Sequence, residues 1–343
     1  MRVRVRGAGI VGLAVAEELL RRGHRVEVVD PAPGSGASYA AAGMVSPVGE
    51  LWHGEERLHA LGRASARLWP AYAERLGVPL RSGTILTAAD AGDLQQVERQ
   101  VGLAVQQGDA ATMLNRRELL RREPGLGRVT GGAWLPDDHS VDPRAVVAAL
   151  LARVPVTPAP AAGPSGGPSG RPEVTVLATG SSLPSVRGER AVRGEILRLR
   201  VDAVDLPGHP VRALVQGRPV YLVPRAHGEV VVGATQEEHD APPVVTAGGV
   251  WRLLDDARRV LPAIDRAVLV EATARDRPGT ADNLPLVGPS GEPGVVLATG
   301  HFRHGVLLAP LTARLVADHL ETGHVEPGLD PRRFATQHPG GSS

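Results

Sequence analysis

Cysteine is absent from this sequence of 343 residues. Its absence excludes disulfide bonds, a thiolate nucleophile, a cysteine-ligated metal and a cofactor tethered through a cysteine. We predict no metal site of any kind.

An excess of charge of either sign is also missing. Lysine and arginine number 38, aspartate and glutamate number 37, and the formal net charge is +1. This balance favours neither nucleic acid nor an anionic membrane surface as a partner. No apolar run approaches the roughly 20 residues of a membrane span, and the first residues, "MRVRVRGAGIVG", enter a motif without room for a signal peptide. We therefore expect a soluble cytoplasmic protein.

Residues 3–30 have the pattern of a strand, a glycine turn, a helix and a second strand. The turn, "GAGIVG", places Gly7, Gly9 and Gly12 in the spacing G-x-G-x-x-G. The next residues, "LAVAEELLRRGHR", put their apolar side chains on one helical face. The strand "VEVVD" follows and ends at Asp30.

These residues are of the types that a dinucleotide site requires. Gly7 permits a tight turn, Gly9 lets the backbone approach a pyrophosphate, and Gly12 allows close packing of the helix. The amino terminus of the helix offers unpaired N–H groups and a positive dipole to the phosphates. Asp30 would accept hydrogen bonds from the ribose hydroxyls. A glycine turn without a ligand is the alternative, but strand, turn, helix and acid together favour dinucleotide binding.

The first strand departs from the pattern of a buried parallel strand, which is almost wholly apolar. Arg2, Arg4 and Arg6 alternate with Val3 and Val5, and a period of two puts the three arginines on one face. We expect that face to be thinly covered, with the arginine stems buried and the heads reaching solvent or acidic groups.

A segment of small residues, "PAPGSGASYAAAGMVSP", follows Asp30. Its glycines and alanines suit a backbone that lies close against a flat or charged ligand, with Ser38 as a hydroxyl donor. A flexible surface loop is the alternative, and the apolar content together with Met44 and Val45 argues against it.

"GAGIVGLAVAEELLRRGHRVEVVD" and "GASYAAAGMVSP" resemble the amino terminus of the FAD-dependent amine oxidases of the D-amino acid oxidase type. "RPGTADNLPLVG" and "ATGHFRHGVLLAP" resemble two later signatures of that family. Three motifs in order make the resemblance specific, and it is strongest to the members that oxidise glycine for thiamine synthesis. It implies a non-covalent FAD cofactor.

The resemblance also implies an α/β fold. An FAD-binding Rossmann-like domain of the glutathione-reductase type would hold an inserted α+β substrate domain with an antiparallel sheet. A chain of this length also exceeds what one hydrophobic core usually supports. The FAD-binding domain would comprise residues 1–80, 135–190 and 275–335. The substrate-binding domain would comprise residues 81–134 and 191–274, and residues 336–343 would form a flexible tail.

An amino acid substrate carries a carboxylate, which a planar guanidinium binds with two parallel hydrogen bonds. The resemblance implies that Arg277 grips this carboxylate and that Arg303, in "GHFRHG", lies beside it and beside the flavin. It also implies that Tyr221 touches the carboxylate. The alternatives are that either arginine pairs with a buried acid such as Asp276 or Asp282, and that Tyr221 is a packed strand residue.

The cofactor site follows from the same resemblance. Gly300 and Gly305 would let the backbone pass close to the isoalloxazine ring. The helix that begins there would stabilise negative charge on the reduced flavin by roughly 0.3–1 kcal/mol. His301 would contribute backbone, whereas His304 would be structural. The residues predicted to bind FAD are Gly7, Gly9, Ile10, Val11, Gly12, Asp30, Pro31, Ala37, Ser38, Ala42, Gly43, Met44, Ala162, Gly180, Gly300, His301, Phe302, Arg303, His304, Gly305, Val306 and Leu307.

The predicted function is that of an FAD-dependent oxidase of glycine, of another small amine or of a D-amino acid. The amine becomes an imine, which hydrolyses to glyoxylate and ammonia or supplies thiazole synthesis, and molecular oxygen becomes hydrogen peroxide. D-amino acid oxidase, D-amino acid dehydrogenase and sarcosine oxidase are alternatives within the family. An inactive flavin-binding scaffold or partner subunit, and a nicotinamide dehydrogenase, are alternatives outside it. Relatives also lead us to expect a homo-oligomer.

Overall fold

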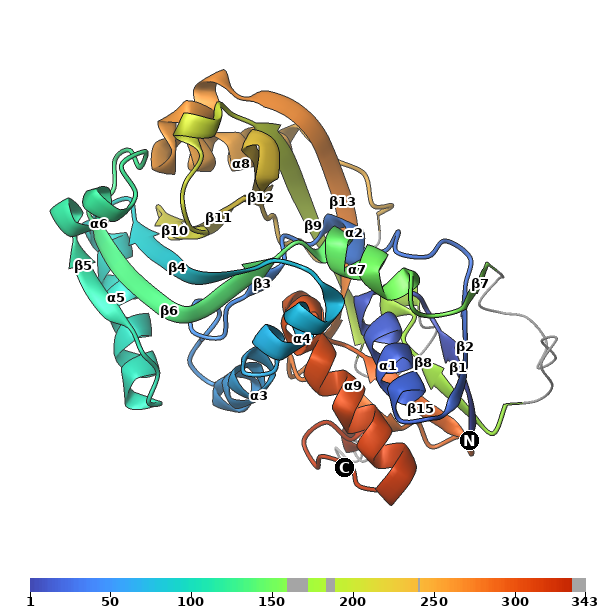
Figure 1. Ribbon diagram of the computed structural model, residues 1–343. Coiled ribbons are helices and arrows are strands. Elements are labelled where there is room, and N and C mark those ends of the chain that lie inside the picture. The colour runs from blue at the N-terminus through green and yellow to red at the C-terminus, as the bar shows by residue number, and fades with distance from the viewer. Residues whose placement is uncertain (159–171, 183–188, 240, 335–343) are drawn as a thin grey trace, which may run out of the picture.

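The computed structural model describes residues 1–158, 172–182, 189–239 and 241–334. The predicted tail, residues 336–343, lies outside this part of the chain. Two sheets organise the described residues into two lobes, and Figure 1 shows helices α1, α7 and α9 packed on the smaller sheet.

The smaller sheet has six strands in the described residues. They lie in the order β14-β15-β8-β1-β2-β7, and all neighbours are parallel except β14 and β15. Strands from both ends of the chain therefore belong to one sheet, with β8 between them, which agrees with the predicted Rossmann-like class. The strands are β1 (Arg2–Arg6), β2 (Arg25–Asp30), β7 (Val156–Pro158), β8 (Val174–Leu177), β14 (Leu286–Pro289) and β15 (Val295–Thr299).

Helix α1 (Ile10–Arg21) packs against α9 (Gly305–Thr322), the helix that follows the last strand of this sheet. Their buried side chains, among them Leu13 and Val316, belong to one apolar cluster with the strands beneath them. Helix α7 (Pro143–Leu151) packs on the other side of α1. The apolar contact between α1 and α9 therefore joins the first helix of this lobe to its last described helix.

The arginines of β1 lie where the alternating pattern places them. Val3 and Val5 are buried, and the arginines between them are partly or fully exposed. Arg4 lies opposite Glu27 of β2 and pairs with it at 3.0 Å. The prediction of a thinly covered face with arginine heads near acids is confirmed.

The larger sheet has nine strands in the described residues. They follow the order β13-β9-β12-β11-β10-β4-β6-β3, with β5 paired to β6, and only β4 and β10 are parallel neighbours among them. The expected antiparallel sheet is therefore present with one parallel pair. Its strands are β3 (Met44–Val45), β4 (Leu80–Ala88), β5 (Thr112–Asn115), β6 (Gly131–Val141), β9 (Glu189–Arg200), β10 (Val211–Val215), β11 (Arg218–Pro224), β12 (Glu229–Gly233) and β13 (Val268–Thr280).

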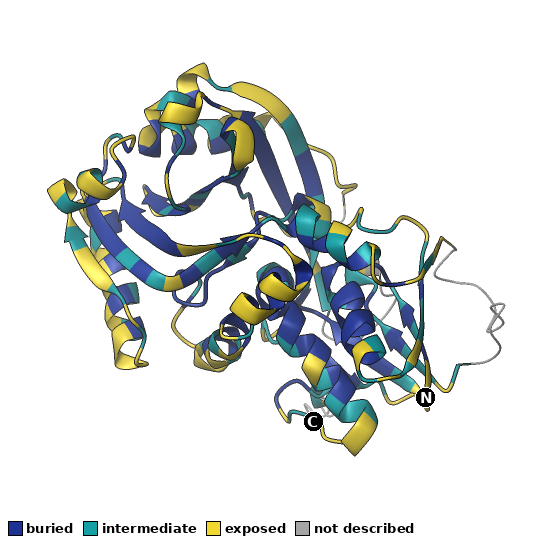
Figure 2. Cartoon of the chain, in the orientation of Figure 1, coloured by how far each residue is buried: buried dark blue, intermediate teal, exposed yellow. Residues whose placement is uncertain are grey.

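The helices around the larger sheet are amphipathic. Helix α8 buries Leu253, Ala257 and Val260 and turns Trp251 toward solvent. Figure 2 shows exposed residues on the outer sides of α5 and α6, away from the sheet. No helix of the described chain is long and apolar enough to cross a membrane. The remaining helices are α2 (Ala37–Ala40), α3 (Glu56–Ala66), α4 (Trp69–Leu76), α5 (Ala91–Gln106), α6 (Arg116–Arg122) and α8 (Ala247–Val260).

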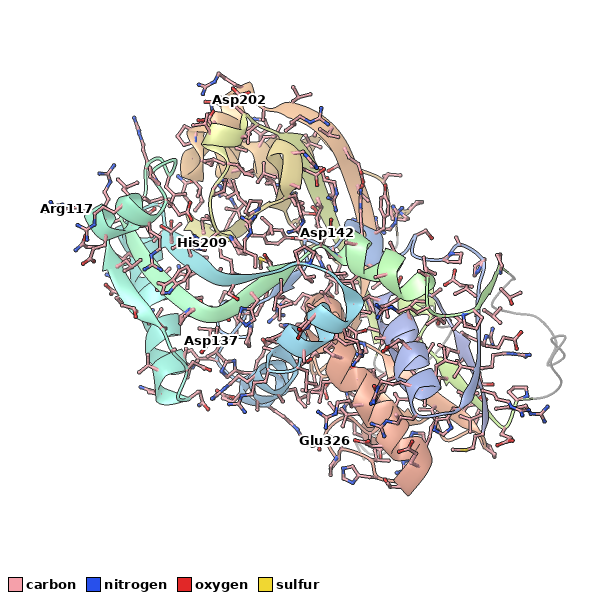
Figure 3. The ribbon with its side chains drawn as sticks, viewed as in Figure 1. Arg117, Asp137, Asp142, Asp202, His209 and Glu326 are labelled. Atoms are coloured by element: carbon pink, nitrogen blue, oxygen red, sulfur yellow. The ribbon has the colours of Figure 1, made fainter. Side chains whose placement is uncertain are left out.

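Long strands connect the two lobes. Strands β6 and β13 run without a break across residues 135 and 275, where domain boundaries were expected. The composition does not change inside either strand, so the sequence gives no signal for a boundary there. The exact domain boundaries stay a prediction. Asp142, labelled in Figure 3, follows β6 and accepts a hydrogen bond from the Arg144 N–H at 2.9 Å. It thereby starts α7 at the passage from the larger sheet to the smaller lobe.

Candidate active site

The glycine turn between β1 and α1 brings three backbone segments together. Gly7 has a φ of +110°, and a Cβ there would lie closer than 3.0 Å to the carbonyl of Ala178. A Cβ on Gly12 would overlap the carbonyl of Gly7, so the helix packs directly on the turn. Gly9 is the N-cap of α1 and has no side chain to cap the helix, while the Ser38 hydroxyl accepts from the Ile10 N–H. In the described residues no side chain binds the N–H groups of Val11 and Gly12, which are therefore open to a ligand.

Asp30 and Ser38 fix the loop around this turn. Asp30 accepts hydrogen bonds from the N–H groups of Ala8 at 2.6 Å and Ala32 at 2.7 Å. The Ser38 Oγ accepts one from the Ile10 N–H at 3.0 Å. The Asp30 carboxylate keeps free lone pairs and the Ser38 hydroxyl keeps its hydrogen. The predicted contacts of Asp30 with a ribose and of Ser38 as a donor stay predictions, which this geometry permits.

One cavity of about 790 Å³ extends from the glycine turn to the start of α9 and has walls from both lobes. Its volume lies in the range of roughly 300–1,000 Å³ that is usual for small-molecule sites. Helix α9 begins beside it at Gly305, and no side chain caps this helix. Two helix amino termini thus present unpaired N–H groups and positive dipoles to the same cavity.

The turn "GHFRHG" between β15 and α9 is buried. Burial lowers the pKa of His301 to about 4, and its Nε2 lies 2.9 Å from the Thr312 Oγ1. Burial, helped by repulsion from Arg303, lowers the pKa of His304 to about 3. Phe302, between them, has a φ of +48°, and the Arg303 guanidinium lies 5.1 Å from the centre of its ring. Because the pKa values of His301 and His304 lie well below 7, both imidazoles are neutral near pH 7.

Arg303 pairs with two glutamates of the loop before α3. Its Nε lies 2.7 Å from Glu50 and its Nη2 lies 2.5 Å from Glu55. Glu50 also pairs with Arg212 of β10 at 2.5 Å. Burial alone would raise the pKa of Glu50, but the attraction of Arg212 and Arg303 outweighs it and holds that pKa at about 2. Arg303 therefore pairs with acidic residues, as the alternative interpretation supposed, but with Glu50 and Glu55 and not with Asp276 or Asp282.

The two aspartates that were considered as partners lie in other ion pairs. Asp276 pairs with Arg193 at 2.5 Å, and Asp282 pairs with Arg333 at 2.8 Å. The sequence could not separate these aspartates from Glu50 and Glu55, because proximity along the chain was the available guide.

Arg277 has a different environment. No carboxylate of the described residues forms an ion pair with it, and its Nη1 donates to the carbonyls of Arg193 and Thr235, both at 3.2 Å. Tyr221 of β11 lies close to Arg277: burial raises the pKa of the Tyr221 hydroxyl, and the positive charge of Arg277 opposes that rise. The structure thus brings together two residues that were predicted to touch a substrate carboxylate, on one wall of the cavity.

Two glycines of the larger sheet make room for this pair. A Cβ on Gly194 of β9 would lie closer than 3.0 Å to three atoms of the Arg277 guanidinium. A Cβ on Gly233, which lies opposite Tyr221 in the pairing of β11 with β12, would lie equally close to the Tyr221 ring and hydroxyl. The side chains of Arg277 and Tyr221 therefore occupy the space that a Cβ on Gly194 or Gly233 would need.

A family model described as FAD dependent oxidoreductase matches residues 2–319. The chain belongs to this family. A "Putative thiamine biosynthesis oxidoreductase ThiO" from Rhizobium etli is 35% identical over 337 residues, which cover 95% of this chain and 98% of the relative. A "Bifunctional protein ThiO/ThiG" from Nostoc sp. is 32% identical over 95% of this chain. The chain spans only 53% of that bifunctional relative.

A solved structure of this family has the same fold. Glycine oxidase from Geobacillus kaustophilus superposes with a TM-score of 0.85 at 30% sequence identity, over 99% of this chain and 100% of the other. The predicted fold class is confirmed by this likeness and by the two sheets.

The cofactor of this FAD-dependent oxidoreductase is FAD, and the cavity suits it. The tight glycine turn and the open start of α1 would hold the diphosphate, and the turn before α9 would lie against the isoalloxazine ring. Gly12 packs on the carbonyl of Gly7 and Gly300 packs against Thr280 and Leu286, and neither lines the cavity. Ala162 lies outside the described residues. The other residues predicted to bind FAD line the cavity: Gly7, Gly9, Ile10, Val11, Asp30, Pro31, Ala37, Ser38, Ala42, Gly43, Met44, Gly180, His301, Phe302, Arg303, His304, Gly305, Val306 and Leu307.

Several cavity residues lay outside the prediction. Glu50 and Glu55 belong to the acidic loop "GELWHGEE", which directly follows the segment of small residues and could have been noticed for that reason. Arg212 is a lone charge in the apolar strand "VRALV", a second available signal. Gly194 and Gly233 carry a weaker one, since an isolated glycine in a strand indicates a bulge or a close approach without saying of what.

Proposed function

We propose that this chain is an FAD-dependent oxidase of glycine or of a similarly small amino acid or amine. The observation that carries the proposal is Arg277, an arginine on the cavity wall with no carboxylate partner among the described residues. The relatives named as glycine oxidase and as thiamine biosynthesis oxidoreductase support the same substrate class.

Arg277 would bind the substrate carboxylate. A partly buried guanidinium without a counter-ion has lost part of its hydration, and a carboxylate that arrives with the substrate restores the balance through two parallel hydrogen bonds. The Tyr221 hydroxyl beside it can donate a third. The wall thereby fixes one end of the substrate, and the α-carbon is presented to the flavin side of the cavity.

The amine would bind without its extra proton. The carboxylates that line the cavity are already engaged: Glu50 and Glu55 with Arg303, Asp276 with Arg193, and Asp30 with backbone N–H groups. The two histidines of the turn before α9 have low pKa values of about 4 and about 3. None of these groups is a suitable base, so the residues around the substrate position it and do not remove a proton.

Bound FAD supplies the acceptor for the α-hydrogen and its two electrons, and molecular oxygen then takes the electrons to give hydrogen peroxide. The substrate loses one hydrogen from carbon and one from nitrogen and becomes an imine. Water converts that imine to glyoxylate and ammonia, or the imine supplies thiazole synthesis. The homo-oligomer expected from relatives stays a prediction, as does a cytoplasmic location.

Anaerobic mixing tests the proposal. The FAD-loaded protein is mixed in turn with glycine, sarcosine and D-alanine, and the loss of flavin absorbance is followed. We expect glycine to bleach the flavin, and subsequent admission of oxygen to restore the colour with formation of peroxide.

The other outcomes identify the alternatives. Bleaching by D-alanine or sarcosine but not by glycine would favour D-amino acid oxidase or sarcosine oxidase. Recolouring by an artificial dye but not by oxygen would favour a dehydrogenase. A flavin that no amine bleaches would support a scaffold or partner subunit, and a colourless protein that takes up no FAD would refute the proposal.

A further inference from the structure

Glu50 occupies an unusual position on the cavity wall. Asp138, which is completely buried, holds the loop before it by accepting hydrogen bonds from the Val48 N–H at 3.0 Å and the Gly49 N–H at 2.8 Å. The side chain of Ser46 donates to the same carboxylate. The loop is therefore fixed from below, and the carboxylate of Glu50 is fixed with it.

The Glu50 carboxylate joins two arginines that come from different lobes. One oxygen accepts from Arg212 of β10 at 2.5 Å, and the other accepts from Arg303 after β15 at 2.7 Å. The three side chains are between 12% and 19% exposed. Both oxygens are thus occupied, and Glu50 has no obvious role in binding a substrate directly.

The position of Arg212 shows why this pairing matters. Arg212 lies directly opposite Tyr221 in the pairing of β10 with β11. Tyr221 and Arg277 both line the cavity, and the charge of Arg277 acts on the Tyr221 hydroxyl. Arg212 and Arg277 therefore lie near the same tyrosine. Without Glu50, Arg212 would have no ion-pair partner among the described residues, whereas Arg303 would keep Glu55.

We propose that Glu50 is a specificity-determining residue that restricts the site to substrates with a single carboxylate. It neutralises Arg212 and shares Arg303 with Glu55, so that Arg277 is the cation at this end of the cavity that remains for a substrate. A second carboxylate on the substrate would meet Glu50 and be repelled, because like charges in a partly buried site repel strongly. This inference rests on the proposed function, since it assumes that Arg277 binds a substrate carboxylate.

Other cavity arginines do not offer this second site. Arg190 pairs with Glu238, and Arg275 donates to the carbonyls of Ser35 and Ala274, close to the loop after β2. Arg190 also donates to Asn283, which in turn donates to Glu55, so its guanidinium is already engaged. A second carboxylate of a substrate would need the positive charge of Arg212, which Glu50 neutralises.

The test compares two ligands that cannot be oxidised at an amine. Acetate and malonate are titrated into the FAD-loaded protein, and their dissociation constants are read from the change in flavin absorbance. In the wild-type protein we expect acetate to bind more tightly than malonate. In Glu50→Gln the ratio of the malonate constant to the acetate constant should fall at least 10-fold, because the shape is kept and one negative charge is removed.

Two variants serve as controls. Glu326 pairs with Arg57 at 3.2 Å outside the cavity, beyond α9 (Figure 3), and Glu326→Gln removes the same charge from an ion pair without changing the ratio. The double variant Glu50→Gln with Arg212→Gln restores the net charge and should return the ratio toward the wild-type value. A merely structural role of Glu50 would give the double variant no such recovery.

The outcomes are distinct. An unchanged ratio in a Glu50→Gln protein that holds FAD would overturn the inference, as would a double variant that remains as shifted as the single one. If Glu50→Gln does not retain FAD, Arg212→Gln alone decides the question, because it leaves Glu50 with less compensation and should raise the ratio. The failure of glycine, sarcosine and D-alanine alike to bleach the flavin would refute the proposed function, while these binding ratios could still be measured.

Discussion

Gly194→Ala tests whether an empty position in β9 determines where Arg277 lies. Gly194 does not have a positive φ, so alanine adds one methyl group without backbone strain. That methyl carbon would lie closer than 3.0 Å to Nη1, Nη2 and Cζ of Arg277, whereas carbon atoms in contact stay about 3.5–4.0 Å apart. The guanidinium must therefore move by about 1 Å. Its 3.2 Å hydrogen bonds to the carbonyls of Arg193 and Thr235 would be lost.

The expected effect follows from the displacement. Misplacement of a positioning group by about 1 Å can cost about 100-fold in rate. We expect kcat/KM for glycine to fall by about 10- to 100-fold, equivalent to about 1.4–2.7 kcal/mol, with most of the change in KM. Peroxide formation at varied glycine concentration measures both constants. The FAD content should equal that of the wild type, because α1 and the loop after β2 form the phosphate site.

Gly102→Ala is the matched control. Gly102 lies in the exposed face of α5, and a Cβ there meets nothing within 4 Å. This variant should keep wild-type kinetics and gain roughly 0.5–1 kcal/mol of stability, as alanine does in a helix. If Gly194→Ala holds FAD and retains the wild-type KM and kcat, the glycine does not determine the position of Arg277, and the steric reasoning is refuted.

Three further predictions concern the cofactor, the substrate and acid stability. Arg277→Lys keeps the charge but loses the planar fork, so KM for glycine should rise at least about 10-fold; steady-state kinetics showing no rise would contradict the carboxylate role. Ser38→Ala removes the acceptor of the Ile10 N–H, and a fluorescence titration of the apoprotein should show FAD binding weakened by about 2- to 10-fold; equal affinity would show that this hydroxyl is dispensable. Because burial lowers the pKa of His304 to about 3, the unfolded chain binds more protons between pH 6.5 and 3, and stability is lost as the pH falls through that window. His304→Asn should therefore unfold at a less pH-dependent temperature between pH 6.5 and 4, and an equally steep decline would exclude His304 as a cause.

Local patterns predicted the cofactor end of the molecule well. The G-x-G-x-x-G spacing, the acid at the end of the second strand and the small residues after it are all consequences of short-range geometry, and β1, α1 and β2 form as expected. The sequence did not reveal where the lobes divide, because β6 and β13 belong to the larger sheet while their ends reach the smaller lobe.

The ion pairs of the cavity were beyond such patterns. Arg303 and Glu50 are separated by 253 residues and Arg212 and Glu50 by 162, so only the folded chain shows that they meet. The same holds for the glycines under Arg277 and Tyr221, whose role depends on what lies across the sheet. Arg277 could be recognised from its motif, but its lack of an acidic partner in the described chain could not.

The order of strands in the smaller sheet has a consequence for folding during synthesis. Strand β8 pairs with β1 on one side and with β15 on the other, and α1 packs against α9. During synthesis the glycine turn after β1 is therefore made before β15 and α9, which complete its lobe. The cavity is lined by Gly305, Val306 and Leu307 of α9 as well as by the glycine turn, so the complete cavity cannot form before α9 has been made.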